Sequence, residues 1–185
     1  MDGSRRPKDD VAFHALGAVD EAQVTIGVCR SLIRENLHSD GAYRGGAYRG
    51  GAARRRNGSK IKRLEDDLSR IQFDLIIAGG ALSTTFTDQL EETMPRIDDI
   101  SIGKLTKTFE WWRGQVDIEP KFVIAGDSRL GAEFDRARTV VRRAERHVVR
   151  LVRERGNRDQ IPVSRYLNQL SDLCFVLARW CDSVL

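Results

Sequence analysis

Arginines that could hold a phosphate chain are concentrated in one segment, residues 137–146. Arg138, Arg142 and Glu145 follow one another at steps of four and three, so they share a helix face. Arg146 lies one turn beyond Arg142 on the same side. A planar guanidinium fork suits phosphate oxygens, and a glutamate can hold a neighbouring arginine in place. Spacing alone also fits a different interpretation, a solvated helix face laced with ion pairs.

Two other places combine polar residues with apolar neighbours. Asn168 and Asp172 lie four apart, so both face one side of a helix. They fit ligand-binding residues and equally fit caps or hydrogen bonds between helices. Asp20 lies between Leu16 and Val24 at steps of four. A carboxylate at the edge of an apolar face requires a cationic partner, which an arginine on another helix or another subunit would supply.

Other kinds of site have no signature in the sequence. There is no GxxxxGK[ST] phosphate loop, and no serine–histidine–acid set can be assigned. The 3 histidines show no metal-ligand spacing, so we predict no protein metal site. The 3 cysteines form no CxxC pair, which indicates buried small side chains in a reducing compartment rather than disulfides.

The elements that must position these residues are helices. Apolar residues recur at alternating steps of three and four in five segments, and strand-type alternation is missing. Breaks fall at Pro95, at Pro120 with Gly126, and at Gly156 with Pro162, and Asp127 or Ser128 could cap the fourth helix. The pattern predicts an all-α fold, a five-helix up-and-down bundle. The five apolar stripes run over 12–33, 61–82, 102–116, 137–151 and 166–184.

The length of 185 residues favours a single domain over 1–185. No apolar run approaches the roughly 18–20 residues that span a bilayer, so we expect no membrane segment. No targeting segment is visible in Met1–Asp10, which is polar.

One segment, residues 39–59, differs in composition from the rest. It repeats Gly-Ala-Tyr-Arg-Gly and contains 5 of the 31 basic residues but 1 of the 27 acidic ones, which leaves 26 of each elsewhere. We expect a disordered Arg/Gly-rich loop there. Its Arg-Gly-Gly triplets could bind RNA, and a helical RNA-associated protein is one hypothesis. The neutral charge of the remaining chain makes nucleic acid an unlikely partner and favours an unselective insertion loop.

Several segments together resemble the PduO-type ATP:cob(I)alamin adenosyltransferases, with the opening segment similar to the animal mitochondrial members. The resemblance covers nearly the whole chain outside the Arg/Gly-rich loop. The arginine-rich helix and the Leu-Asn-x-Leu-Ser-Asp segment are the most specific signals when they occur in this order. The matching segments are Arg5–Asp10, Ala15–Glu21, Ile71–Leu75, Gly79–Leu82, Phe122–Ile124, Ala137–Arg146 and Tyr166–Asp172.

The resemblance implies a homotrimer with active sites between subunits. Each site would bind ATP with Mg²⁺ and, next to it, cobalamin as the second substrate. The implied reaction transfers the 5′-deoxyadenosyl group of ATP to cob(I)alamin and releases triphosphate. A corrinoid reductase and an adenosylcobalamin-dependent mutase are possible further partners. The implied location is the mitochondrial matrix in a eukaryote and the cytoplasm otherwise.

The family's functional residues carry over by position. Arg142 and Arg146 would contact the triphosphate, and Arg142 with Phe122 would be catalytic. Phe122 matches the aromatic residue that crowds the lower face of the corrin, displaces the lower axial ligand and leaves four-coordinate cobalt(II). Asp20 and Arg138 would pair across the subunit boundary, and Asp172 would support the site. The implied nucleotide-binding residues are Lys8, Arg142, Arg143, Glu145, Arg146 and Asn168.

The sequence departs from the family pattern at two places. Family members carry a Thr-x-x-Gly-Asp-x-Gly-type loop around the ATP phosphates, whereas this sequence starts at Met1-Asp2-Gly3-Ser4, downstream of that loop. This leaves open a second hypothesis, a catalytically impaired corrinoid- or ATP-binding homologue. After Phe122, Ala125-Gly126-Asp127 stands where a Pro-Gly-Gly-like turn is expected. The added carboxylate could repel phosphate or cap the next helix.

Overall fold

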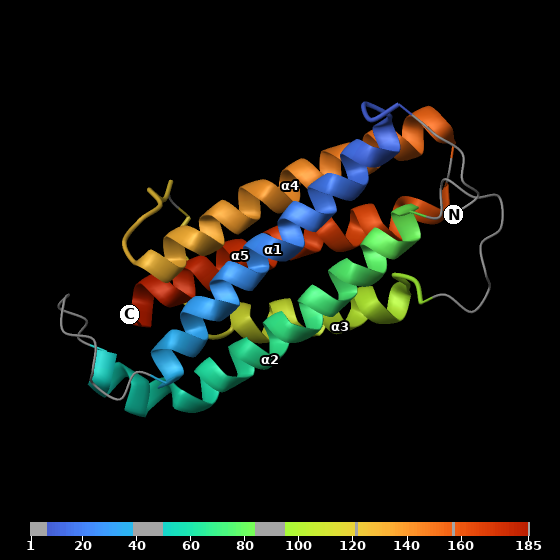
Figure 1. Cartoon of the computed structure of the whole chain (residues 1–185). Coiled ribbons are helices and arrows are strands. Elements are labelled where there is room, and N and C mark those ends of the chain that lie inside the picture. The colour runs from blue at the N-terminus through green and yellow to red at the C-terminus, as the bar shows by residue number, and fades with distance from the viewer. Residues whose placement is uncertain (1–6, 39–49, 84–94, 121, 157, 185) are drawn as a thin grey trace.

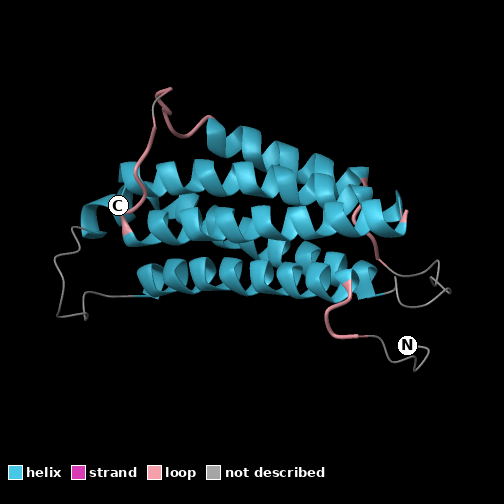
Figure 2. Cartoon of the chain, turned by 90° about the horizontal axis from the view of Figure 1, so that it is seen from above, coloured by secondary structure: helices cyan, strands magenta, loops and turns pink. Residues whose placement is uncertain are grey.

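The structure is a computed structural model that describes residues 7–38, 50–83, 95–120, 122–156 and 158–184. Within these ranges the regular elements are all helical, as Figure 2 shows. The all-α prediction is therefore confirmed. The long helices are α1 (Val11–His38), α2 (Gly50–Ser83), α3 (Asp99–Arg113), α4 (Arg129–Arg155) and α5 (Ile161–Val184), with the short 3-10 helix η2 (Arg158–Gln160) before α5.

Successive helices run in opposite directions along one bundle, which confirms the predicted five-helix up-and-down arrangement (Figure 1). Helix α5 packs against α4 on one side and α3 on the other, and α1 packs against both α4 and α2. Helix α5 therefore lies between the two helices that matter most below, α3 and α4.

The core consists of the apolar stripes that the sequence displays. Leu64, Leu68 and Ile71 of α2 are fully buried, as are Val141 of α4 and Leu170 of α5. Removing a side chain of this size from water stabilises the fold by about 1.5–3 kcal/mol. The 3 cysteines are free and buried, as predicted. Among the described residues, no helix is long and apolar enough to cross a membrane.

Local signals set several helix ends. The Ser128 hydroxyl accepts a hydrogen bond from the Gly131 amide at 3.0 Å, so Ser128, and not Asp127, is the N-cap of α4. Helix α4 ends at Arg155 and is capped by Gly156, whose φ of 68° lies in the left-handed region that glycine tolerates. The third apolar stripe extends to Val116, but α3 stops at Arg113 because the chain turns at Gly114.

The loop expected over 39–59 needs correction at its end. Helix α2 begins at Gly50, so residues 50–59 form its first turns rather than a loop. Residues 52–56, Ala-Ala-Arg-Arg-Arg, are strong helix formers and outweigh the neighbouring glycines. The remainder of the expected loop, 39–49, lies outside the described residues.

Candidate functional site

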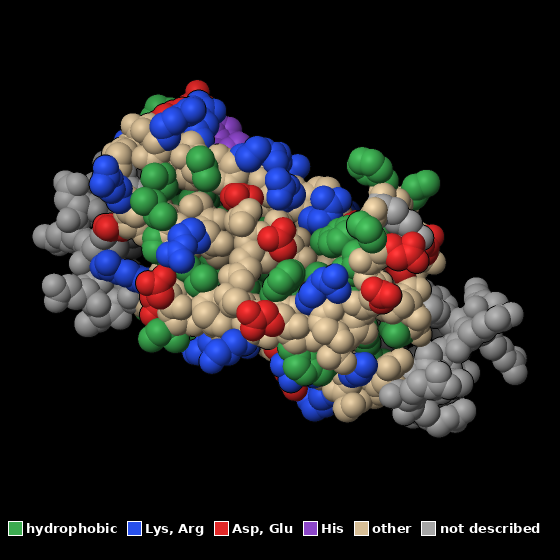
Figure 3. Space-filling view, turned by 180° about the vertical axis from the view of Figure 1, so that it is seen from behind, with side chains coloured by type: hydrophobic (Ala, Val, Ile, Leu, Met, Phe, Trp, Pro, Cys, Tyr) green, Lys and Arg blue, Asp and Glu red, His purple; other side chains and the backbone are tan. Residues whose placement is uncertain are grey.

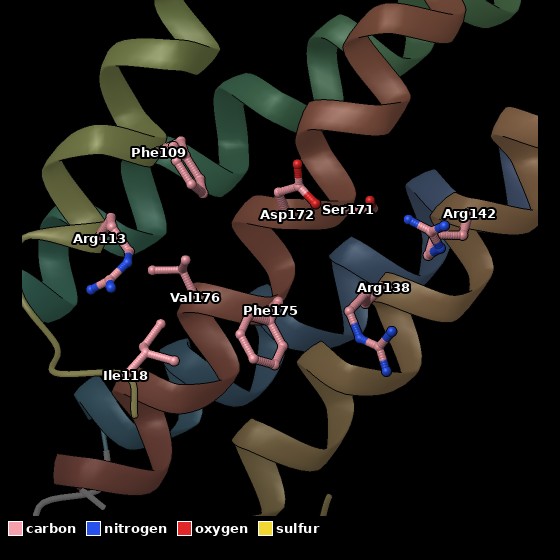
Figure 4. A pocket seen from close by; sticks show the side chains of 9 residues that line it. All are labelled: Phe109, Arg113, Ile118, Arg138, Arg142, Ser171, Asp172, Phe175 and Val176. Carbon is pink, nitrogen blue, oxygen red and sulfur yellow. The ribbon is translucent and has the colours of Figure 1, made fainter. Parts of the chain in front are cut away.

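A pocket of about 370 Å³ lies over α5, between α3 and α4. Three residues singled out from the sequence meet there: Arg138 and Arg142 from α4 and Asp172 from α5. They meet because four-residue spacing puts the two arginines on one side of α4, next to the face of α5 that carries the aspartate. The lining residues, labelled in Figure 4, are Phe109, Arg113, Ile118, Arg138, Arg142, Ser171, Asp172, Phe175 and Val176.

The two arginines differ in how they are held. The Arg138 side chain is 35% exposed, and its Nε donates to Asp135 Oδ1 at 3.3 Å. Arg142 is exposed. No hydrogen bond or ion pair joins Arg142 to another side chain in the part of the chain that the structure describes. Arg138 is thus positioned by the protein, while Arg142 retains its five donors for a ligand.

The opposite side of the pocket is apolar and aromatic. Figure 4 shows Phe109 and Ile118 on the α3 side and Phe175 on α5, with the arginines of α4 across from them. Arg113 also belongs to this wall, and its Nη1 donates to the Val116 carbonyl at 3.1 Å. A cationic side facing an aromatic side suits a ligand that carries both an anionic group and a ring.

Arg143 faces away from this pocket. Its guanidinium pairs with Glu21 of α1, because one step along a helix rotates a side chain by about 100°. Next to this pair the rings of His14 and His147 stack at 5.8 Å between centroids. Burial, followed by the nearby charge of His14 and of arginines, lowers the pKa of His147. Within one chain, therefore, the guanidinium of Arg143 is paired with α1 and lies outside the pocket lining.

The other predicted residues lie outside the pocket lining. Arg146 on α4 and Asn168 on α5 are exposed and lie one turn away from Arg142 and Asp172, and Glu145, also on α4, is partly buried. The remaining three are exposed at separate places: Lys8 before α1, Asp20 on α1 and Phe122 before α4. Asp20 and Arg138 form no pair within the chain among the described residues.

Sequence reasoning missed two groups of residues. The α3 wall, Phe109 and Arg113, carried no signal beyond membership in an apolar stripe and the end of a helix. The second group is a buried ion network, in which Arg179 pairs with Asp135 and Asp182. Burial alone would lower the pKa of Arg179, but bonds to the two carboxylates outweigh it and raise that pKa. From the sequence alone, Asp135, Arg179 and Asp182 would be predicted to be ordinary charged residues at the surface.

On the face of the molecule opposite to that in Figure 1, basic and acidic side chains are interspersed and do not form separate patches. In the space-filling view, basic and acidic side chains alternate over this face, with apolar side chains between them (Figure 3). A face of this kind offers separate small sites, such as the arginine-lined pocket, rather than one extended basic track.

Comparisons with known proteins identify the family of the chain. The profile of the cobalamin adenosyltransferase family matches residues 1–181. The chain is 29% identical to human corrinoid adenosyltransferase MMAB over 181 residues, which is 96% of the chain but 62% of the human protein. It is 31% identical to corrinoid adenosyltransferase from Mycobacterium leprae, covering 96% of the chain and 82% of that protein.

The fold is also similar to solved structures. One is a variant PduO-type ATP:corrinoid adenosyltransferase from Lactobacillus reuteri complexed with cobalamin and ATP. The TM-score is 0.74 at 25% identity, over 97% of this chain and 84% of that chain. A profile match over nearly every residue, relatives from mammals and bacteria, and a shared fold lead to one conclusion: the chain belongs to the cobalamin adenosyltransferase family.

Proposed function

We propose that this chain transfers the 5′-deoxyadenosyl group of ATP to cob(I)alamin, giving adenosylcobalamin and triphosphate. The observation that carries the proposal is the pocket in which Arg138, Arg142 and Asp172 meet. These are three of the positions that family resemblance assigns to the site, and they come from two helices. The Lactobacillus reuteri relative, which shares the fold, is complexed with both substrates.

The chemistry requires little from the protein beyond placement and charge. Cobalt(I) is itself a strong nucleophile and attacks the 5′-carbon of ATP, so no activated serine or cysteine is needed. Triphosphate leaves, and negative charge gathers on its bridging oxygen. Arg142, with its guanidinium unpaired within the described chain, stabilises that charge. The ligand packs against the aromatic side of the pocket, and this contact keeps water away from the cobalt.

A second copy of the chain completes the site in this proposal. Asp20 is exposed on α1, and Val24, one turn along, is 57% exposed, which is the kind of surface a neighbouring subunit covers. In a homotrimer, Asp20 of one subunit pairs with Arg138 of the next. The residues that lie outside the pocket in one chain then meet the nucleotide from two chains. They are Lys8, Arg143, Glu145, Arg146 and Asn168.

Phe122 is the residue we assign to the corrin. Its side chain is fully exposed, as is most of Ile124 at 88%, in the segment that precedes α4. Large apolar side chains on a loop that none of the described helices covers are typical of a ligand-binding surface. Phe122 lies against the lower face of the corrin and excludes the lower axial ligand.

Magnesium fits this pocket as a partner of the nucleotide. Mg²⁺ is usually held by one or two carboxylates and by substrate phosphates. Asp172 is the carboxylate among the described lining residues, and no group of three or more metal-binding side chains occurs in the described ranges. Asp172 would thus hold a magnesium ion jointly with the triphosphate. When bound, the ion supplies positive charge to the leaving group.

The reaction also defines its partners and location. We expect a corrinoid reductase to supply cob(I)alamin and an adenosylcobalamin-dependent mutase to use the product. We place the protein where both would occur, in the mitochondrial matrix of a eukaryote or the cytoplasm of a bacterium.

The test is direct. The full chain is mixed with ATP, Mg²⁺ and chemically reduced cobalamin, and adenosylcobalamin is followed by absorbance. Arg142→Ala should lower kcat by about 100- to 1,000-fold, the range for losing a transition-state donor. Arg153→Ala, an exposed arginine farther along α4, should leave kcat unchanged.

Equal kcat for Arg142→Ala and wild type would refute the phosphate assignment. Absence of product from wild type, with measurable ATP and corrinoid binding, would instead identify an impaired homologue.

A further inference from the structure

A chain of buried charges connects α4 with α5 near the pocket. Arg179 Nη2 donates to Asp135 Oδ2 at 2.5 Å and to Asp182 Oδ2 at 2.9 Å, and Arg179 Nε donates to Asp182 at 3.1 Å. The three side chains are 9%, 7% and 10% exposed, respectively. We name Asp135, Arg179 and Asp182 the charge relay.

One end of the relay reaches the segment that carries Phe122. The second oxygen of Asp182, Oδ1, accepts from the Ser128 amide at 3.1 Å and from its hydroxyl at 2.8 Å. Ser128 is the N-cap of α4 and directly follows residues 122–127. Asp182 therefore fixes the point at which the Phe122 segment joins the rigid bundle.

The other end of the relay reaches the pocket. Asp135 Oδ1 accepts from Nε of Arg138, a pocket residue, at 3.3 Å. The guanidinium carbon of Arg179 lies 5.3 Å from the centroid of the Phe175 ring, which also lines the pocket. Two lining side chains, one cationic and one aromatic, thus rest on relay residues.

Stability alone is a weak reason for this arrangement. Buried ion networks can often be replaced by packed apolar side chains at no loss of stability, whereas removing one partner leaves an uncompensated charge. What an apolar replacement would not provide is direction, because guanidinium and carboxylate bonds fix the angles of Arg138 and of the Ser128 backbone.

We propose that Asp135, Arg179 and Asp182 are positioning residues that hold the corrin-facing segment, 122–127, and the phosphate-facing pocket in one fixed relation. This inference rests on the proposed function, since it names which substrate each end of the relay serves. The Ser128 end serves the corrinoid, and the Asp135 end serves the nucleotide. Asp182 and Arg179 connect the two.

Variants at the two ends test the proposal with opposite expectations. Ser128→Ala removes both bonds of the hydroxyl, to Asp182 and from the Gly131 amide, and leaves the buried charges intact. It should raise KM for cobalamin by about 3- to 10-fold or more with little change in KM for ATP, because one net hydrogen bond is worth about that factor and two are lost. Asp135→Asn keeps one acceptor for Arg179 but turns an amide toward Arg138. It should raise KM for ATP and leave KM for cobalamin unchanged.

Hydrogen exchange provides a readout that does not depend on turnover. Asp182→Ala should speed amide exchange over residues 122–131 by about 10-fold or more, while exchange in α2 stays as in wild type. The matched control is Asp74→Asn, which alters another partly buried carboxylate at the α2–α5 contact, where Asp74 accepts from Tyr166 at 2.8 Å. This control should change neither the exchange of 122–131 nor either KM.

Two results would overturn the relay. One is unchanged exchange over 122–131 in both Asp182→Ala and Ser128→Ala. The other is the finding that Ser128→Ala and Asp135→Asn each change KM for cobalamin and KM for ATP to the same extent, or change neither. If wild type shows no turnover, the proposed function fails separately, and titrations of cobalamin and of ATP against the same variants replace the KM comparison.

Discussion

Gly131 has a role that a single methyl group can test. A Cβ built on this residue would lie 2.1 Å from Asp182 Oδ1 and 2.7 Å from the Ser128 hydroxyl oxygen. Gly131→Ala must therefore push Asp182 away from Ser128. Each hydrogen bond to a charged group contributes about 1.5–3 kcal/mol, so at the lower end of this range losing both Ser128 bonds costs about 3 kcal/mol. Alanine has a higher helix propensity than glycine, which stabilises the variant by about 1 kcal/mol, so the free energy of unfolding falls by about 2 kcal/mol in total.

The same substitution in α3 should have the opposite sign. Gly103 is helical, and a Cβ there meets no atom within 4 Å. Gly103→Ala should stabilise the fold by about 0.5–1 kcal/mol through helix propensity and reduced freedom of the unfolded chain. The two alanine variants thus add the same atoms to two helices, and they differ only in what surrounds the new methyl group.

Thermal and urea unfolding, followed by helical circular dichroism at one fixed protomer concentration, measures both effects. For a chain of this size about 1 kcal/mol corresponds to about 2–4 °C in Tm, so Gly131→Ala should lower Tm by about 4–8 °C. Gly103→Ala should raise it by about 1–4 °C. A Gly131→Ala protein as stable as wild type would show that Asp182 does not occupy this position, and it would remove the anchor of the charge relay.

The remaining predictions concern stability, pH and thiol chemistry. Trp112→Phe should lower the free energy of unfolding in urea by about 2–3 kcal/mol, because the buried Nε1 of Trp112 donates to the Asp67 carboxylate at 2.9 Å. The Trp111 side chain is partly exposed, so Trp111→Phe should lower this free energy by less than about 1 kcal/mol. Since the folded pKa of His147 is lowered, the unfolded chain binds its proton more readily, and stability is lost as pH falls through the ordinary value of 6.5. The drop in Tm between pH 7.5 and 5.5 should therefore shrink in His147→Gln, and an equal drop would contradict this sign. Burial raises the pKa of Cys29 to about 12, and the other two thiols are buried as well, so a thiol reagent at pH 8 should label the protein only after unfolding.

The fold was accessible from the sequence because burial repeats with the period of the helix. The first apolar stripe, Ala12 to Ile33, is buried along its length, and the same holds for the stripe of α2. Helix ends were less predictable, as α2 shows: a run of small and basic residues has no apolar period, although its backbone is helical from Gly50.

The site was accessible only in part, for a geometric reason. Arg142 and Asp172 each lie on a predictable face, and antiparallel packing of α4 on α5 brings those faces together. The partner of Arg143 depends on where α1 packs, and the α3 wall depends on how α3 crosses α5. Asp135 and Arg179 are charged, so composition places them on the surface, and only the packed bundle shows that they neutralise each other inside it.

The position of α5 also constrains how the chain acquires its shape during synthesis. Of its 24 residues, 13 are buried, and α3 and α4 both pack against it. The four α-helices that precede it leave the ribosome first, and the apolar faces of α3 and α4 that α5 covers are still exposed at that point. These helices must wait, as a loosely associated set, until residues 161–184 emerge. A ribosome that stalls before that point would thus release a chain in need of chaperones, however well its earlier helices form.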